Sequence, residues 1–276
     1  MGKHFFLTHR PLTPHYTPMP LIKVNGADID VVQAGAGRDL VLLHSLLADR
    51  TAFDRVAPAL AEKRRITLVN LPGYGASKAH GVSVNDYADH IAGLLRALKL
   101  PPQTDVLGNG LGGFIAIALA CRHGASFDRL IIADSLATFP PAGKEPLRQM
   151  AERVRQQGMG AVLDAAINRM FPPAFVAANP DLVTQRKAAL AKADPACFSR
   201  ACLALSEVDL TPLLAGIRNP AFVMVGALDG ATPALLACDL ANGIAGAKYL
   251  EIPGCGHCPQ LEMPEVFIRT VEEFLQ

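Results

Sequence analysis

Three loops of this chain carry polar side chains of the kinds that move protons. Asp229 lies within Gly226-Ala-Leu-Asp-Gly-Ala-Thr-Pro233, and His257 lies within Gly254-Cys-Gly-His-Cys-Pro259. The third loop is His44-Ser45-Leu46-Leu47. A histidine can take a proton near neutral pH and return it, and a neighbouring carboxylate can hold the imidazole in one tautomer. An aspartate and a histidine in such loops indicate general acid–base chemistry if the fold brings the loops together.

A fourth loop is unusually rich in glycine. The stretch from Thr104 to Gly113 (TDVLGNGLGG) predicts a short buried strand, a tight turn and a helix that begins at Leu111. This layout matches the nucleophile elbow, Gly-x-Ser-x-Gly, in which a sharp strand-to-helix turn exposes a serine oxygen. The flanking glycines are present, but the central residue is Gly110. Glycine suits a strained turn and offers no atom for attack, so we expect an intact elbow without its nucleophile.

The rest of the chain is predicted to alternate buried strands with helices. Apolar runs predict strands at 22–24, 29–32, 40–43, 66–70, 105–107, 130–133, 222–225 and 248–252, the first two joined by a hairpin turn at Asn25-Gly26. Helical spacing predicts helices at 51–62, 83–98 with a capping box at Ser83, 111–122, 233–242 and 264–275. This alternation favours an α/β fold with a mostly parallel, doubly wound sheet. The four loops would then follow the carboxyl ends of strands, where ligands bind in such folds.

The alternation is interrupted between residues 138 and 214, where the pattern is only helical. Helices are predicted at 147–156, 159–170, 179–193 and 196–205, separated by proline-containing turns. We expect this segment to be a lid inserted into a core formed by residues 21–137 and 215–276, with residues 1–20 as an N-terminal arm. Arg148, Arg153 and Arg169 of the lid could contact a substrate carboxylate, although solvated helix faces explain these arginines equally well.

Composition limits the partners that the chain could have. Of the 276 residues, 50% are apolar and 18% are charged, and the formal net charge is +1 without basic or acidic runs. These values predict a well-packed core and give no support for a nucleic acid or an anionic membrane as partner. The six cysteines suggest a reducing compartment, and no segment resembles a signal peptide or a membrane span. We expect a cytoplasmic protein with a small-molecule substrate, no metal and no organic cofactor; the oligomeric state is not indicated.

Together these loops resemble the α/β-hydrolase family, and the resemblance extends from about Leu21 to the C-terminus. The family's triad follows the chain order nucleophile, acid, histidine, and Asp229 and His257 occupy the acid and histidine positions. The turn at 70–77 (NLPGYGAS) is similar to the family's Asp-x-x-Gly-x-Gly-x-Ser segment, with asparagine in place of the first aspartate. The Leu46 loop and the lid look most like 3-oxoadipate enol-lactonase and its esterase relatives. The resemblance implies hydrolysis of a small ester or enol-lactone by acyl transfer.

The resemblance also implies roles for other groups. The backbone N–H groups of Leu46 and Leu111 would form the oxyanion hole, which does not depend on side-chain identity. Asp134, which ends the strand after the elbow helix, is the alternative triad acid to the favoured Asp229. Ser45 and Phe171 are the candidate substrate contacts.

Gly110 leaves three hypotheses about activity. In the one favoured from the sequence, the chain is a hydrolase whose serine has been replaced artificially, which inactivates it. In the second, a natural homologue uses the histidine and aspartate to activate water or abstract a proton. In the third, the protein keeps the pocket only to bind a small molecule. Ser45, Cys255 and Cys258 could supply a substitute nucleophile, but nothing in the sequence places their side chains at the elbow, so each is expected to be structural.

Overall fold

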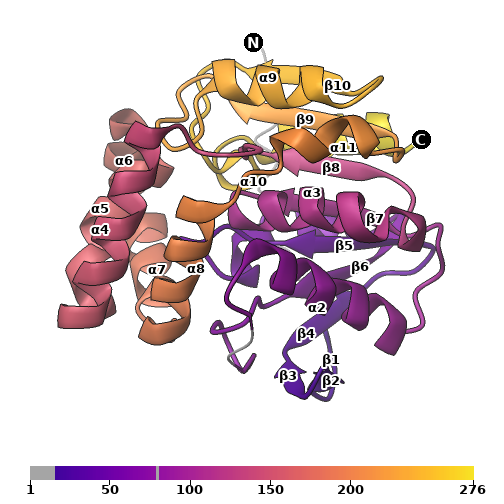
Figure 1. Ribbon diagram of the computed structural model, residues 1–276, viewed down its shortest axis with the longest axis horizontal. Coiled ribbons are helices and arrows are strands. Elements are labelled where there is room, and N and C mark those ends of the chain that lie inside the picture. Colours follow the sequence, from indigo (N-terminus) through magenta and orange to yellow (C-terminus); the bar gives the residue numbers. More distant parts are fainter. Residues whose placement is uncertain (1–15, 79–80) are drawn as a thin grey trace, which may run out of the picture.

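The computed structural model describes residues 16–78 and 81–276, which are built around an eight-stranded sheet (Figure 1). The strand order is β1-β4-β6-β5-β7-β8-β9-β10. Neighbouring strands from β6 to β10 are parallel, whereas β4 joins β6 and β1 joins β4 in antiparallel pairs. The strands are β1 (Thr17–Pro18), β4 (Val31–Ala34), β5 (Arg38–Leu43), β6 (Arg64–Val69), β7 (Asp105–Asn109), β8 (Leu130–Ala133), β9 (Ala221–Gly226) and β10 (Lys248–Ile252). The predicted mostly parallel sheet is confirmed.

Helices cover both faces of this sheet. One face packs against α2 (Val84–Ala97), α3 (Leu111–His123) and α9 (Ala234–Gly243), and the other against α1 (Ala57–Ala61) and α11 (Pro264–Leu275). Along β5, Val41 and Leu43 join the first layer while Leu40 and Leu42 join the second. All four side chains have no exposed surface, which explains why this strand is a continuous apolar run in the sequence.

The N-terminal strands differ from the prediction. The hairpin turn at Asn25-Gly26 is present, with φ of 47° and 83°, and it joins β2 (Ile22–Val24) to β3 (Ala27–Ile29). The predicted single strand 29–32 is wrong, because the Asp30 amide donates to Ser77 Oγ (2.8 Å) instead of continuing the ladder. The predicted arm, residues 1–20, contributes β1 to the sheet edge; its residues 1–15 lie outside the described residues.

The first turns of two predicted helices differ in how well they match the prediction. The helix expected at 51–62 is instead a 3₁₀ turn at Arg50–Phe53 followed by α1, whose first turn contains a proline that cannot donate to a preceding carbonyl. The capping box of α2 is confirmed: Ser83 Oγ accepts from the Asp86 amide (3.2 Å) and the Asp86 carboxylate accepts from the Ser83 amide (3.0 Å).

The segment between β8 and β9 is a helical insertion that stands at one end of the sheet, on the left of Figure 1. It contains α4 (Pro141–Gln157), α5 (Leu163–Met170), α6 (Pro173–Ala178), α7 (Pro180–Leu190) and α8 (Pro195–Glu207). Helix α6 was predicted as a turn, but Pro173 occupies its first position, where a missing amide costs nothing. The two ends of the insertion meet where the Leu210 amide donates to Ala137 O (2.9 Å) and Thr138 Oγ1 donates to Val208 O (2.9 Å).

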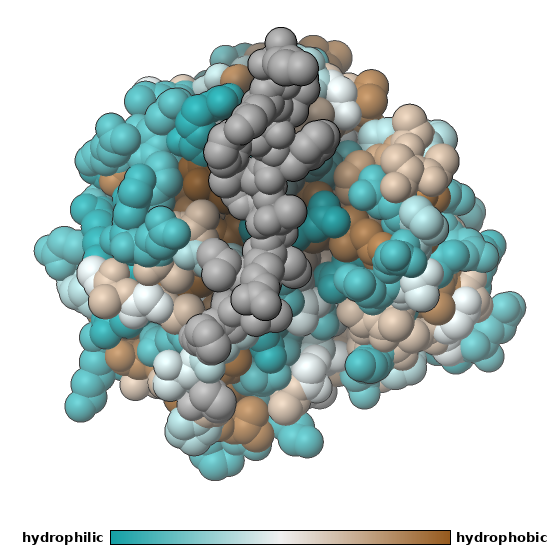
Figure 2. All heavy atoms as spheres, turned by 180° about the vertical axis from the view of Figure 1, so that it is seen from behind, coloured by the Kyte–Doolittle hydropathy of each residue, from teal (hydrophilic) through white to brown (hydrophobic). Residues whose placement is uncertain are grey.

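On the side shown in Figure 2, hydrophilic residues predominate and hydrophobic ones occur in small groups. Within the described residues, no helix is both long enough and apolar enough to cross a bilayer.

Candidate active site

The glycine-rich loop forms a sharp turn between β7 and α3. Gly110 has φ 55° and ψ −118°, a conformation that residues with a Cβ rarely adopt. A Cβ on Gly108 would lie 2.1 Å from Gly112 O, and a Cβ on Gly112 would lie 2.2 Å from Leu43 O. The flanking glycines therefore allow the helix to start directly against the strands, as an elbow requires.

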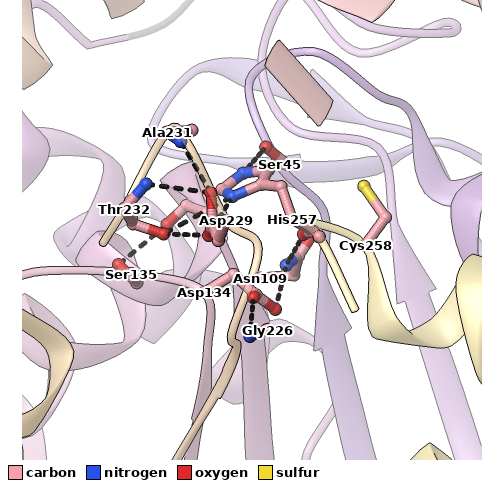
Figure 3. Close-up of polar contacts among 12 residues, drawn as sticks. Ser45, Asn109, Asp134, Ser135, Gly226, Asp229, Ala231, Thr232, His257 and Cys258 are labelled. Atoms are coloured by element: carbon pink, nitrogen blue, oxygen red, sulfur yellow. Dashed lines mark hydrogen bonds and ion pairs between the residues drawn. The ribbon is translucent and has the colours of Figure 1, made fainter. Parts of the chain in front are cut away.

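His257 and Asp229 are brought together beside this turn (Figure 3). His257 Nδ1 lies 2.8 Å from Asp229 Oδ2, and both side chains are buried. The amides of Ala231 and Thr232 donate to Asp229 Oδ1 at 2.7 and 3.0 Å, and the Thr232 hydroxyl donates to Oδ2. Burial alone would raise the pKa of Asp229, but His257 and these hydrogen bonds outweigh it and hold the pKa below its usual value. Asp229 is therefore an ionised carboxylate that orients the imidazole.

Asp134 lies behind this pair and does not contact the histidine ring within hydrogen-bond distance. Its Oδ1 accepts from the Gly226 amide at 2.9 Å, and its Oδ2 lies 3.4 Å from Asn109 Nδ2. Complete burial, together with the charge of Asp229, raises its pKa well above the usual value. The pKa is therefore raised at Asp134 and lowered at Asp229, and this difference in direction, together with the contact at 2.8 Å, favours Asp229 as the charged partner of His257.

The loop that carries His257 is held from several sides. Glu262 accepts from the amides of Gly256 (2.7 Å) and Cys258 (2.9 Å), and Asn109 Nδ2 donates to His257 O (3.1 Å). The His257 amide donates to Met170 O (2.9 Å), at the end of α5 in the helical insertion. The roles of Asn109 and Glu262 were not predicted from the sequence. Asn109 lies between two glycines of the elbow, a position that could have marked it as a candidate, whereas no such signal marks Glu262.

His44 fixes the loop that faces His257. Its Nδ1 donates to Ser45 O (2.8 Å) and its Nε2 accepts from the Leu71 amide (3.0 Å), an arrangement that requires a neutral ring. Burial lowers the pKa of His44 to about 4, which keeps the ring neutral. The Ala48 amide also donates to Ser45 O, and the Tyr74 hydroxyl donates to Leu46 O.

The position of the Ser45 side chain differs from the expectation that it would lie away from the elbow. Its Oγ lies 3.2 Å from His257 Nε2, inside the protein. A Cβ built on Gly110 would lie 2.4 Å from Ser45 Oγ and 2.9 Å from His257 Nε2. No local sequence pattern predicts this hydroxyl at the elbow, because the loops of residues 45 and 110 meet only in the folded chain.

The two amides expected to form an oxyanion hole border the same space. Leu111 is the first residue of α3, so its amide has no carbonyl partner within the helix. Neither this amide nor that of Leu46 donates to another protein group among the described residues. Both residues line a cavity together with His257.

A family model described as the alpha/beta hydrolase family matches residues 40–270. This chain belongs to that family. Among its relatives, 3-oxoadipate enol-lactonase 2 of Acinetobacter baylyi is 26% identical over 86% of this chain and 88% of the relative. A pimeloyl-[acyl-carrier protein] methyl ester esterase of Chromobacterium violaceum is 30% identical over 88% of this chain and 96% of the relative. The enol-lactonase structure from Burkholderia xenovorans matches with a TM-score of 0.86 at 28% identity, covering 93% of this chain and 99% of that one.

In this α/β hydrolase the cavity beside His257 is small, about 30 Å³, or room for about one water molecule. Its walls include Ser45 and Arg169, and its aromatic side is formed by Phe114 and Phe139, whose rings stack with centroids 5.3 Å apart. Phe171, a predicted substrate contact, does not line it. Phe171 is buried within the helical insertion and stacks on Phe175 at 5.0 Å.

A larger groove of about 470 Å³ lies outside the cavity, between α4 and α5. Arg153 and Arg169 both line the groove, but only Arg169 also lines the inner cavity. Among the described residues, the Arg169 guanidinium has no hydrogen-bond or ion-pair partner, and burial lowers its pKa. Arg169 therefore stands between the groove and His257 as a partly desolvated cation.

Asp134, Asp229 and His257 could each offer a ligand atom to a metal, since these atoms lie within 4.8 Å of one another. The donor set does not fit a metal site well. Backbone and hydroxyl donors already occupy both oxygens of Asp229, the Gly226 amide donates to Asp134 Oδ1, and burial raises the pKa of Asp134, which disfavours the charged form that a metal would bind. Of the two carboxyl groups, Asp229 is the one hydrogen-bonded to the histidine ring.

Cys255 and Cys258 form no disulfide, and both thiols are buried. Burial raises the pKa of both thiols, so neither is a ready thiolate. Cys255 packs in the layer beside α11, on the face of the sheet opposite α3. The expectation that these residues are structural agrees with this placement.

Proposed function

We propose that this chain hydrolyses small carboxylic esters or lactones, with His257 as the general base and Asp229 as the residue that orients it. The observation that carries the proposal is the position of the imidazole. Its Nδ1 is bound to an ionised Asp229, and its Nε2 faces a cavity bordered by the free amides of Leu46 and Leu111. These are the parts that acyl transfer needs: a base, and donors for the oxyanion of a tetrahedral intermediate.

The relatives support the class of substrate. The matched enol-lactonases and the methyl ester esterase are named for lactone or ester hydrolysis, and this chain covers 88–99% of their length. Aligned over most of its length with such proteins, this chain is proposed to act on the same bond. The attacking oxygen must come from a group other than residue 110, and it must be able to give its proton to His257 Nε2.

The first experiment measures hydrolysis of p-nitrophenyl esters and enol-lactones by the unaltered chain, by His257→Ala and by Gly110→Ser. We expect turnover by the unaltered chain and its loss in His257→Ala. If the unaltered protein is inactive and only the Gly110→Ser variant hydrolyses these compounds, the hypothesis of a replaced serine is supported. If all forms are inert but bind such compounds, the pocket serves binding alone.

A further inference from the structure

Among the described residues that line the cavity, Ser45 carries the one hydroxyl placed at His257 Nε2. The other cavity hydroxyl, that of Thr232, is on the far side of the ring: it donates to Asp229 and lies 3.5 Å from Nδ1. The nearby Ser135 hydroxyl donates to Gly110 O at 3.0 Å. A proton from Ser45 Oγ, 3.2 Å from Nε2, has a direct path to the base.

Ser45 also fills the space that an elbow side chain would need. A Cβ on Gly110 would lie 2.4 Å from Ser45 Oγ and 2.9 Å from Ser45 Cβ, far inside van der Waals contact. Gly110 is therefore the residue that admits the Ser45 hydroxyl to the place from which the elbow serine normally attacks. A side chain at position 110 would require the Ser45 side chain to shift, so glycine at 110 and serine at 45 form one arrangement.

The Ser45 hydroxyl is held by a stiff backbone. The Ser45 carbonyl accepts from His44 and from the Ala48 amide, and the His44 carbonyl accepts from the Gly112 amide at 3.1 Å. The loop of residues 44–48 is thus tied to the elbow helix itself. Such fixed positioning beside the base and the oxyanion donors is what nucleophilic catalysis requires.

From these contacts, and resting on the function proposed above, we propose that Ser45 is the nucleophile of this enzyme. Ser45 Oγ gives its proton to His257 Nε2 and bonds to the carbonyl carbon, while the carbonyl electrons move onto the oxygen near the amides of Leu46 and Leu111. Collapse of this intermediate breaks the bond to the leaving alkoxide, which takes the proton from Nε2. The acyl group stays on Ser45 Oγ.

The second half-reaction restores the enzyme. A water gives a proton to Nε2 and attacks the acyl carbon. Collapse then breaks the bond to Ser45 Oγ, which takes the proton back. Ester and water have become acid and alcohol, with no other reactant.

The test uses an alkyl fluorophosphonate, which phosphonylates an activated serine with loss of fluoride. The unaltered protein, Ser45→Ala, Ser45→Cys and His257→Ala are treated with the probe, and the modified peptide is identified by mass spectrometry. Ser126→Ala, which alters a hydroxyl bound to His123 O away from the cavity, is the matched control. We expect one phosphonyl group on Ser45, slow labelling in His257→Ala, and unchanged labelling of Ser45 in the control.

Kinetics give the second readout. Ser45→Ala should lower kcat/KM by about 10³-fold or more and abolish any burst, while thermal unfolding shows that it is folded. If Ser45→Ala keeps its turnover, or if Ser45 is not phosphonylated, the assignment of Ser45 is overturned even though the enzyme hydrolyses esters. If Ser45 is phosphonylated but no ester or lactone is turned over, the nucleophile stands and the proposed substrate class fails.

Discussion

Residue 110 combines backbone strain with a steric limit. Its φ of 55° and ψ of −118° disfavour any side chain, and the space around its missing Cβ is taken by Ser45 and His257. In an ordinary elbow the neighbouring loop must leave this space empty. Here Ser45, from the loop of residues 44–48, occupies it, so a serine at the elbow would have to displace the Ser45 side chain.

Gly110→Ser should therefore destabilise the fold, by about 1–3 kcal/mol for the strained backbone and the displaced Ser45 side chain. The double variant Gly110→Ser with Ser45→Gly keeps the strain and relieves the contact at 2.4 Å, so it should recover part of the loss. Urea unfolding followed by circular dichroism measures both. Equal stability of the single and double variants would show that Ser45 turns away without cost.

Asp134 and Asp229 give stability opposite dependences on pH. The pKa of Asp134 is raised in the folded protein, so in the unfolded chain this carboxyl loses its proton at lower pH. The free energy of unfolding therefore decreases as pH rises above about 3.9. The pKa of Asp229 is lowered, so its contribution is present at neutral pH and disappears as pH falls through the folded pKa. The limiting slope for either group is about 1.4 kcal/mol per pH unit.

Asp134→Asn should thus gain stability relative to the unaltered protein as pH rises from 4 toward 8, because it removes the carboxyl whose pKa is raised on folding. The asparagine can still accept a hydrogen bond from the Gly226 amide. Asp229→Asn should be less stable at neutral pH, with the difference closing in acid. Only Asp229→Asn should lose most of its hydrolytic activity, by about 10⁴-fold if the histidine takes the wrong tautomer. Inactivity of Asp134→Asn alone would reverse the assignment of the acid.

At the scale of elements, the sequence predicted what periodicity and loop chemistry determine. The buried strands, the elbow, the capping box of α2 and the helical insertion follow from local patterns, and all are present. The split at Asp30 depends on a side chain 47 positions away, Ser77, and no local pattern reports such a bond. The same limit explains Ser45, whose neighbours at Gly110 and His257 come from other elements.

Helix α5 places Arg169 at the passage from the groove to His257, which predicts a preference for substrates with a negative group. Arg169→Gln should raise KM for the p-nitrophenyl monoester of a dicarboxylic acid by about 10-fold or more, because a charged hydrogen bond in a partly buried site is worth about 1.5–3 kcal/mol. The neutral ester of equal length should be little affected.

Arg153→Gln is the matched control, since Arg153 is exposed and lines the outer groove but not the inner cavity. Its charge is screened by water and salt, so its effect on the same pair of esters should be smaller. A similar rise in KM for charged and neutral esters in Arg169→Gln would mean that this arginine only shapes the passage.

At the scale of the whole molecule, the site is formed between two bodies of structure. The core supplies His257, Asp229 and the elbow, while the helical insertion closes over them and leaves about 30 Å³. An ester is far larger than one water molecule, so we expect the insertion to move when substrate enters. The places where its ends meet, at 137–138 and 208–210, are where we expect it to pivot. We expect turnover to depend on this motion as well as on the chemistry.

One backbone hydrogen bond makes that motion measurable. The His257 amide donates to Met170 O of the insertion, whereas the amides of Gly256 and Cys258 donate to Glu262 within the core. Opening should therefore expose the amide of His257 to deuterium and leave its two neighbours protected. Residue-resolved hydrogen–deuterium exchange measured by NMR would then report the rate of opening through the exchange rate of the His257 amide. The amides of Gly256 and Cys258 serve as internal references. If all three amides exchange together, the histidine loop unfolds as a unit and the insertion does not open by itself.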